Sequence, residues 1–244
     1  MYILLLILFL AYVLVAAILG YRNSKKIIGK EYTKNEKIKN YRIDLIASWI
    51  PVFVLIPIFL FFKISLHDIG FRLINFNYNI WFSVITLIIS VGAFAHFVIQ
   101  MIAYLVSEKH REKIKIELLK PENELLYNIM LPHNIKEKKY WFCISLTAGI
   151  CEEIIFRGLF LFILQGLFPN LSIVFIIIIA IILFGLGHLY QGIGGVIKTA
   201  LVGAIFTCLY LVTNSLFLVI FLHFIIDFSS AFLIKEEKTI ENKV

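Results

Sequence analysis

The chain has 244 residues, of which 61% are hydrophobic and only 16% are charged. A soluble globular chain has about 45–50% apolar and about 25% charged residues. The mean hydropathy of +0.92 departs from a soluble chain in the same direction. These values exclude soluble, disordered, collagen-like, coiled-coil and disulfide-scaffold classes, and they predict an integral membrane protein.

The net charge is +7, from 23 Lys and Arg against 16 Asp and Glu. In a soluble domain such an excess would suggest nucleic acid. Here the basic residues lie in loops beside apolar segments, where they indicate membrane topology and face anionic lipid. We therefore expect the lipid bilayer as a partner and no nucleic acid.

Three cysteines, Cys143, Cys151 and Cys208, lie inside apolar segments. They are odd in number and lack the C-x-x-C spacing of a metal or redox site. The sequence therefore predicts neither a disulfide framework nor a zinc finger.

Seven apolar stretches follow one another along the chain, each long enough to cross about 30 Å of hydrocarbon at about 1.5 Å per residue. We expect an all-α fold, a polytopic membrane helix bundle of about seven transmembrane helices, forming a single integral membrane domain over residues 1–244. The stretches are 2–19, 45–62, 80–106, 141–168, 171–189, 193–212 and 216–234.

The basic residues are distributed unevenly among the loops. Segments 21–44 and 107–140 carry eight Lys and Arg each, and the tail after residue 234 carries three more, whereas segment 63–79 has only Lys63 and Arg72. Because basic loops stay in the cytoplasm, we expect a multi-pass protein of the cell membrane with its N-terminus outside and its C-terminus cytoplasmic. Segment 107–140 is too short for a soluble domain and fits either a surface helix or a solvated linker.

Ionisable residues gather inside the later apolar stretches. Because a charge at the bilayer centre costs about 2.5–3.5 kcal/mol on insertion scales, such residues are candidates for function. Pairs four residues apart, Glu153 with Arg157 and His223 with Asp227, share a helix face, whereas Glu152 points about 100° away from Glu153. Counting along the helices places the whole set in the cytoplasmic half of the bilayer. The set is Glu152, Glu153, Arg157, His188, His223 and Asp227.

These residue types suit the activation of water. A carboxylate paired with an imidazole can take a proton from water and pass it to a leaving amine, while other donors stabilise the oxyanion. Histidines and carboxylates could equally hold a divalent metal such as zinc, and spacing does not choose between the two. The ligands of that alternative would be Glu152, His188, His223 and Asp227.

Three motifs carry a resemblance to a known family. Glu152-Glu153-x-x-x-Arg157, Phe184-x-x-x-His188 and His223-x-x-x-Asp227, in this order on successive apolar helices, resemble the motifs of the CAAX-processing and bacteriocin-immunity protease family, also called the Abi family. The resemblance covers the motif-bearing region 141–234 and implies an intramembrane endopeptidase. It also implies a peptide or membrane-protein substrate.

The same resemblance suggests roles for the site residues. It implies that Glu152 and His188 activate water and that Glu153 and Arg157 support them. The third motif is associated with oxyanion stabilisation, but an ionised Asp cannot donate a hydrogen bond. We therefore expect Asp227 to orient His223 or to bind a metal. The family has been described both as metal-dependent and as metal-independent; we expect no cofactor, with zinc as the alternative.

Two other classes of function remain open from the sequence. One is a non-catalytic bacteriocin-immunity or partner-binding membrane protein. The other is a proton-coupled transporter whose acids and histidines form a relay, although the chain lacks the internal repeat typical of such transporters.

Overall fold

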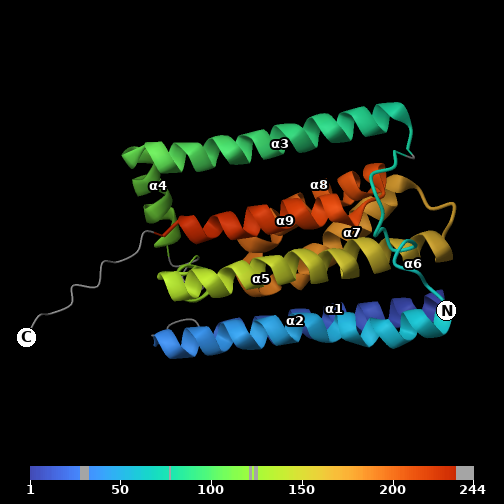
Figure 1. The fold of residues 1–244 in the computed structure, drawn as a ribbon, viewed down its shortest axis with the longest axis horizontal. Helices are drawn as coiled ribbons and strands as arrows, with labels where there is room; N and C mark the ends of the chain where they lie inside the picture. Colours follow the sequence, from blue (N-terminus) through green and yellow to red (C-terminus); the bar gives the residue numbers. More distant parts are fainter. Residues whose placement is uncertain (28–32, 77, 121–122, 124–125, 235–244) are drawn as a thin grey trace, which may run out of the picture.

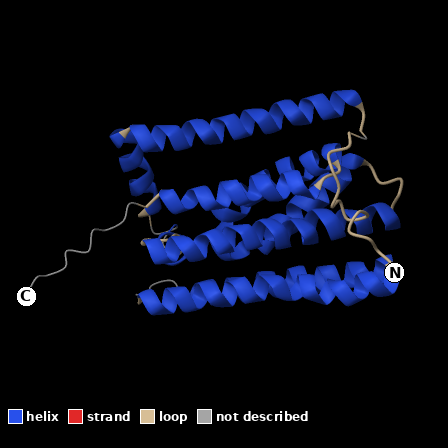
Figure 2. Cartoon of the chain, in the orientation of Figure 1, coloured by secondary structure: helices blue, strands red, loops and turns tan. Residues whose placement is uncertain are grey.

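The computed structural model describes residues 1–27, 33–76, 78–120, 123 and 126–234. Throughout these ranges the regular elements are helices, and no strand is found in them (Figure 2). The long helices lie side by side as one bundle (Figure 1). The predicted all-α membrane bundle is confirmed.

The first three long helices match the first three predicted stretches. They are α1 (Tyr2–Ile27), α2 (Lys34–Phe62) and α3 (Ile80–Val106). Helices α1 and α2 are longer than the predicted stretches. Each continues into the basic segment 21–44, because polar and charged residues can carry on the backbone hydrogen bonds of a helix beyond its apolar part. Helix α2 begins with a capping box, in which Thr33 and Glu36 each bond to the other's backbone N–H.

The segment before the motif region contains a short helix, α4 (Glu108–Leu118), and a single π turn, η2 (Leu126–Met130). Helix α4 lies at one end of α3 (Figure 1). Its last residue, Leu118, is buried against Leu131 and Ile234. The structure thus favours a surface helix over a linker for residues 108–118.

The motif region supplies the remaining helices. A continuous helix is formed by α5 (Ile135–Glu153), the π turn η3 (Ile154–Leu159) and α6 (Phe160–Leu167). Then follow α7 (Ile173–Gly187), the 3-10 turn η4 (Leu189–Gln191), α8 (Gly192–Thr213), α9 (Leu216–Ser229) and the 3-10 turn η5 (Ser230–Phe232). Each predicted apolar stretch is therefore mostly helical, and three of them contain a local departure from α geometry.

Packing places this continuous helix near the middle of the bundle. Helix α5 packs on α9 and α2, α7 packs on α8, and α1 covers α6, α7 and η4. The side chains of Phe160, Ile163 and Val219 are almost fully buried in the core between them. Many outer side chains of α1, α2 and α3 are apolar and exposed, which suits contact with lipid.

Within the described residues, four helices are long and apolar enough to cross a membrane by length and composition: Tyr2–Lys26, Asn35–Phe62, Ile80–Val106 and Leu189–Thr213. Two shorter apolar helices accompany them, Ile173–Gly187 and Leu216–Phe232. The charged residues of the first motif lie at the end of α5 and in η3.

A buried ion pair joins the starts of α2 and α5. Lys37 Nζ lies 3.2 Å from Glu137 Oε2, and both side chains are almost fully buried. The same ammonium donates to the carbonyl of Leu131 at 2.5 Å. Nearby, the hydroxyl of Tyr41 donates to the carbonyl of Met130 at 2.8 Å. These contacts fix the segment that leads into the motif-bearing helix.

Candidate active site

The first motif lies where α5 passes into the π turn η3. Glu152 and Glu153 are the last residues of α5, and Arg157 lies within η3. A π turn holds about one residue more than an α turn and occurs often at functional sites. Glu153 and Arg157 are 0% and 1% exposed, so this turn carries an ion pair into the interior of the bundle.

Arg157 is held by three kinds of contact. One guanidinium nitrogen donates to Glu153 Oε1 at 2.9 Å, and another donates to the carbonyl of Gly203 on α8 at 3.1 Å. The guanidinium carbon lies 4.2 Å from the centre of the Phe184 ring, a cation–π contact. The predicted pairing of Glu153 with Arg157 is confirmed.

Gly203 makes this arrangement possible on the α8 side. A Cβ atom there would lie 2.7 Å from Cδ1 of Phe184 and 3.4 Å from a nitrogen of Arg157. The first distance is too short for a real contact, so a side chain at this position would displace the ring that covers the guanidinium.

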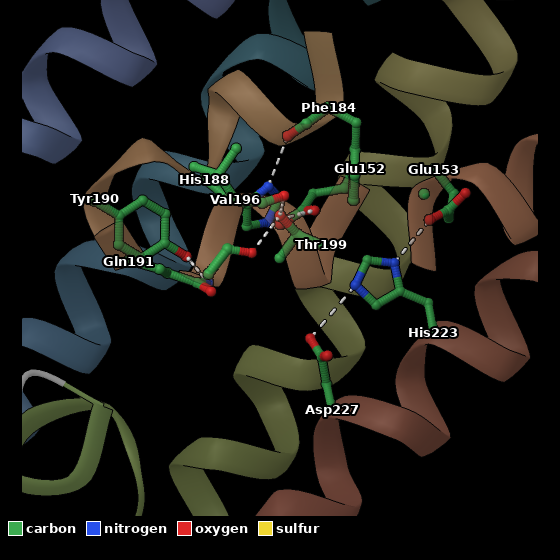
Figure 3. Close-up of polar contacts among 12 residues, drawn as sticks. Glu152, Glu153, Phe184, His188, Tyr190, Gln191, Val196, Thr199, His223 and Asp227 are labelled. Atoms are coloured by element: carbon green, nitrogen blue, oxygen red, sulfur yellow. Dashed lines mark hydrogen bonds and ion pairs between the residues drawn. The ribbon is translucent and has the colours of Figure 1, made fainter. Parts of the chain in front are cut away.

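His223 joins the first motif to the third. Its Nδ1 lies 2.7 Å from Glu153 Oε1, and its Nε2 lies 3.4 Å from Asp227 Oδ2 (Figure 3). Carboxylate oxygens only accept hydrogen bonds, so an imidazolium with two N–H donors satisfies both neighbours. The predicted contact between His223 and Asp227 is confirmed, and it fits the expectation that Asp227 orients the ring.

His188 follows the last residue of α7 and faces the other carboxylate of the first motif. Its Nε2 lies 3.6 Å from Glu152 Oε2. Its Nδ1 lies 2.9 Å from the carbonyl of Phe184, and because a carbonyl only accepts, Nδ1 carries a proton. In the neutral ring, Nε2 is then an acceptor directed at Glu152 (Figure 3). The Phe184 ring packs against the imidazole with the ring centres 4.7 Å apart, as the spacing of four predicts.

The site therefore divides into accessible residues, Glu152, His188 and Asp227, and a sealed group, Glu153, Arg157 and His223. The side chains of Glu152, His188 and Asp227 are 28%, 12% and 37% exposed, whereas those of the sealed group are at most 9% exposed. Glu152 Oε2 and Glu153 Oε2 have no hydrogen-bond partner among the described residues. Because only the Glu152 side chain is accessible, its oxygen is the one that can accept a hydrogen bond from a molecule entering the site.

The metal alternative requires several ligands at one point. Among the described residues, no group of three or more His, Cys, Asp and Glu side chains could hold a metal ion. The four residues predicted as ligands divide into two pairs, Glu152 with His188 and His223 with Asp227.

Three contacts of the site were not predicted from the sequence. The bond between Glu153 and His223 crosses from one helix to another, and spacing along one helix carries no signal for it. Trp141 on α5 donates to the carbonyl of Asp227 at 3.1 Å and to Ser230 Oγ at 3.0 Å, which fixes the end of α9. Tyr190 in η4 lies beside His188, with ring centres 5.9 Å apart.

Comparisons with known proteins agree with the motifs. Residues 136–229, less than half of the chain, match the family described as type II CAAX prenyl endopeptidase Rce1-like. Searches among curated proteins and among solved structures gave no match. The matched segment contains all six residues predicted for the site. Over residues 136–229 the chain is therefore similar to the Rce1-like family, a finding consistent with the resemblance to the CAAX-processing and bacteriocin-immunity family.

Proposed function

We propose that the protein is an intramembrane endopeptidase in which Glu152 and His188 activate a water molecule. One observation carries this proposal: two hydrogen-bond acceptors, Glu152 Oε2 and His188 Nε2, face each other 3.6 Å apart. Two acceptors do not bond to each other, but a water molecule can donate one hydrogen bond to each of them. The similarity of residues 136–229 to a protease family supports the same reaction.

In the proposed reaction, the water oxygen attacks the carbonyl carbon of the scissile peptide. As the new C–O bond forms, Glu152 takes a proton from the water and the carbonyl π pair moves to its oxygen. The proton then passes to the leaving nitrogen as the C–N bond breaks. The products are a carboxyl group and an amine, so the atoms balance. His188 holds the water through Nε2 while the Phe184 carbonyl fixes its tautomer.

The sealed group has a positioning role in this proposal. Arg157 and His223 both donate to one oxygen of Glu153, so three helical segments meet at a single carboxylate. Because Glu153 precedes η3 directly and neighbours Glu152, fixing Glu153 also fixes the backbone that presents Glu152. Rigid support of this kind is what a catalytic constellation needs to stay within about 0.5 Å of its productive geometry.

The arrangement of basic residues supports the proposed topology. The last turn of α1, with Lys25 and Lys26, lies at the same end of the bundle as α4 and the start of α5, while Met1 lies at the opposite end (Figure 1). By the positive-inside rule, we propose that the end with α4 is cytoplasmic and that the N-terminus lies outside. The C-terminal tail, residues 235–244, with three Lys and three Glu, lies outside the described residues.

A peptide or a membrane-protein segment is the substrate class that this proposal implies, with no resident metal. The test uses purified protein in lipid nanodiscs and a library of fluorescence-quenched peptides, together with the membrane and secreted peptidomes of expressing cells. Glu152→Gln should lower cleavage by about 10²–10⁴-fold, the usual contribution of a general base. Glu112→Gln, at an exposed position on α4, is the matched control and should cleave normally.

The outcome separates the three classes of function. Loss of cleavage in Glu152→Gln alone supports the protease. Undiminished cleavage in that variant would refute it. An immunity phenotype that survives Glu152→Gln without any cleavage would favour a partner-binding protein, and proton-coupled flux into vesicles would favour a transporter.

A further inference from the structure

We propose that Tyr190 is the hydrogen-bond donor to the oxyanion of the tetrahedral intermediate, an inference that rests on the proposed peptidase function. It begins from a shortage of donors. In the site described above, both ring nitrogens of His223 face carboxylates, and Nδ1 of His188 faces a backbone carbonyl. Arg157 is 1% exposed and cannot reach a substrate. Asp227, when ionised, only accepts hydrogen bonds.

Tyr190 lies where such a donor is needed. It is the middle residue of η4, two positions after His188, and the planes of the two rings are inclined by 31°. Its phenol interacts electrostatically with both Glu152 and Asp227. Figure 3 shows Tyr190 and Gln191 on the side of His188 away from Glu153. The phenol thus lies beside His188, close enough to Glu152 and Asp227 to interact with their charges.

The hydroxyl has a proton to donate. Gln191 Nε2 donates to the Tyr190 oxygen at 3.1 Å, so in this bond the oxygen is the acceptor. Its own O–H remains free for another acceptor, and a hydroxyl that accepts one hydrogen bond is a stronger donor in the next. The oxyanion of a tetrahedral intermediate is such an acceptor.

Three glycines allow this placement. A Cβ at Gly195 would lie 2.3 Å from Cβ of Gln191, so glycine there leaves room for the Gln191 side chain. Gly192, with φ of +76°, turns the chain from η4 into α8 in a conformation that glycine adopts without strain. On the other side, α1 approaches closely at Gly20, where a Cβ would lie 3.4 Å from Cβ of Tyr190.

In the reaction, the carbonyl π pair moves onto oxygen as the water attacks, and Tyr190 O–H forms a hydrogen bond to that oxygen. The phenol keeps its proton throughout, so the proton from water still travels through Glu152 to the leaving nitrogen. The bond is stronger in the transition state than with the neutral carbonyl, and such a contact raises kcat more than it changes KM.

The test measures kcat and KM of full-length Tyr190→Phe in nanodiscs, on a peptide that the wild-type protein cleaves. We expect kcat to fall by about 10²–10³-fold, the usual effect of removing one oxyanion donor, with KM and the melting temperature unchanged. Gln191→Met should give a smaller fall in kcat. The matched control is Tyr12→Phe: Tyr12 on α1 also interacts electrostatically with Glu152, and this variant should keep its kcat.

Each result decides the question. Unchanged kcat in Tyr190→Phe, a change in KM alone, or a fall in kcat for Tyr12→Phe instead would overturn the assignment. If Tyr190→Phe does not fold, Gln191→Met decides, and an unchanged kcat overturns the inference. If Glu152→Gln is inactive and Tyr190→Phe is fully active, the role of Tyr190 is refuted and the proposed peptidase function stands. If Glu152→Gln is active, both the role of Tyr190 and the proposed function are refuted.

Discussion

Replacing Arg157 with methionine removes a cation that the protein buries at 1% exposure while leaving its anionic partner in place. The variant loses two charge-assisted hydrogen bonds, of 2.9 Å to Glu153 and 3.1 Å to the Gly203 carbonyl. At about 1.5–3 kcal/mol each, these bonds sum to about 3–6 kcal/mol. Breaking one side of a buried ion pair costs about 3–5 kcal/mol in other proteins. We therefore expect Arg157→Met to lower the free energy of unfolding by about 3–5 kcal/mol.

For a chain of this length, about 1 kcal/mol corresponds to about 2–4 °C, so Tm should fall by about 6–20 °C. Circular dichroism of purified protein in one detergent measures this change. The matched control is Glu108→Gln, which breaks a surface pair with Arg111 at 3.5 Å and should change Tm by no more than about 4 °C. A fall of less than about 2 °C in Arg157→Met would refute the reasoning.

A double variant separates the cost of the buried Glu153 charge from the cost of lost packing around Arg157. Adding Glu153→Gln to Arg157→Met removes the carboxylate that has lost its guanidinium partner, while the new amide oxygen still accepts from His223. The double variant should therefore melt above the single variant Arg157→Met. A lower Tm would mean that lost packing around the guanidinium, and not buried charge, dominates the cost.

Further predictions concern the supports of the site. Gly203→Ala should lower Tm, because overpacking costs about 1–3 kcal/mol where a new Cβ meets an aromatic ring at 2.7 Å; an unchanged Tm would show that the ring moves freely. Trp141→Phe loses the hydrogen bond to the Asp227 carbonyl and should lower the free energy of unfolding by about 1–3 kcal/mol, measured by Tm. Its kcat should also fall; a normal kcat would show that the position of the end of α9 does not affect catalysis. Lys37→Met leaves Glu137 buried without its cation and should cost about 3–5 kcal/mol by thermal unfolding, and an effect below about 1 kcal/mol would contradict burial of the pair. Peptide cleavage should persist after chelation and dialysis; loss restored by zinc would contradict the metal-free proposal.

Sequence spacing predicted the contacts that lie within one helix. Glu153 with Arg157 and His223 with Asp227 are four apart, and helix geometry alone brings such pairs together. The pairing of Glu152 with His188 fits their estimated depths, because the rise per residue is nearly constant. The family match spans the same three motifs.

The contacts between helices could not be predicted in this way. Whether His223 meets Glu153 depends on how far α9 is rotated about its axis relative to α5, and rotation is set by packing at close approaches. At Gly149, a Cβ would lie 3.1 Å from the carbonyl oxygen of Ile220. Tyr190 was missed because a tyrosine near the end of an apolar stretch is ordinary at a membrane interface.

Because of the π turn η3, the geometry of the site depends on the number of residues between α5 and α6. A deletion of one residue between Ile154 and Leu159 would let this stretch relax into α-helix, and because an α turn holds about one residue fewer, α6 would keep its orientation relative to α5. Such a change would leave Glu152, Glu153 and α6 in place while reorienting the residues within the turn, among them Arg157. An alignment of related sequences that allows one-residue gaps between the motifs would therefore separate relatives that keep this turn from those that have lost it. It would do so even where each of the six side chains is still present.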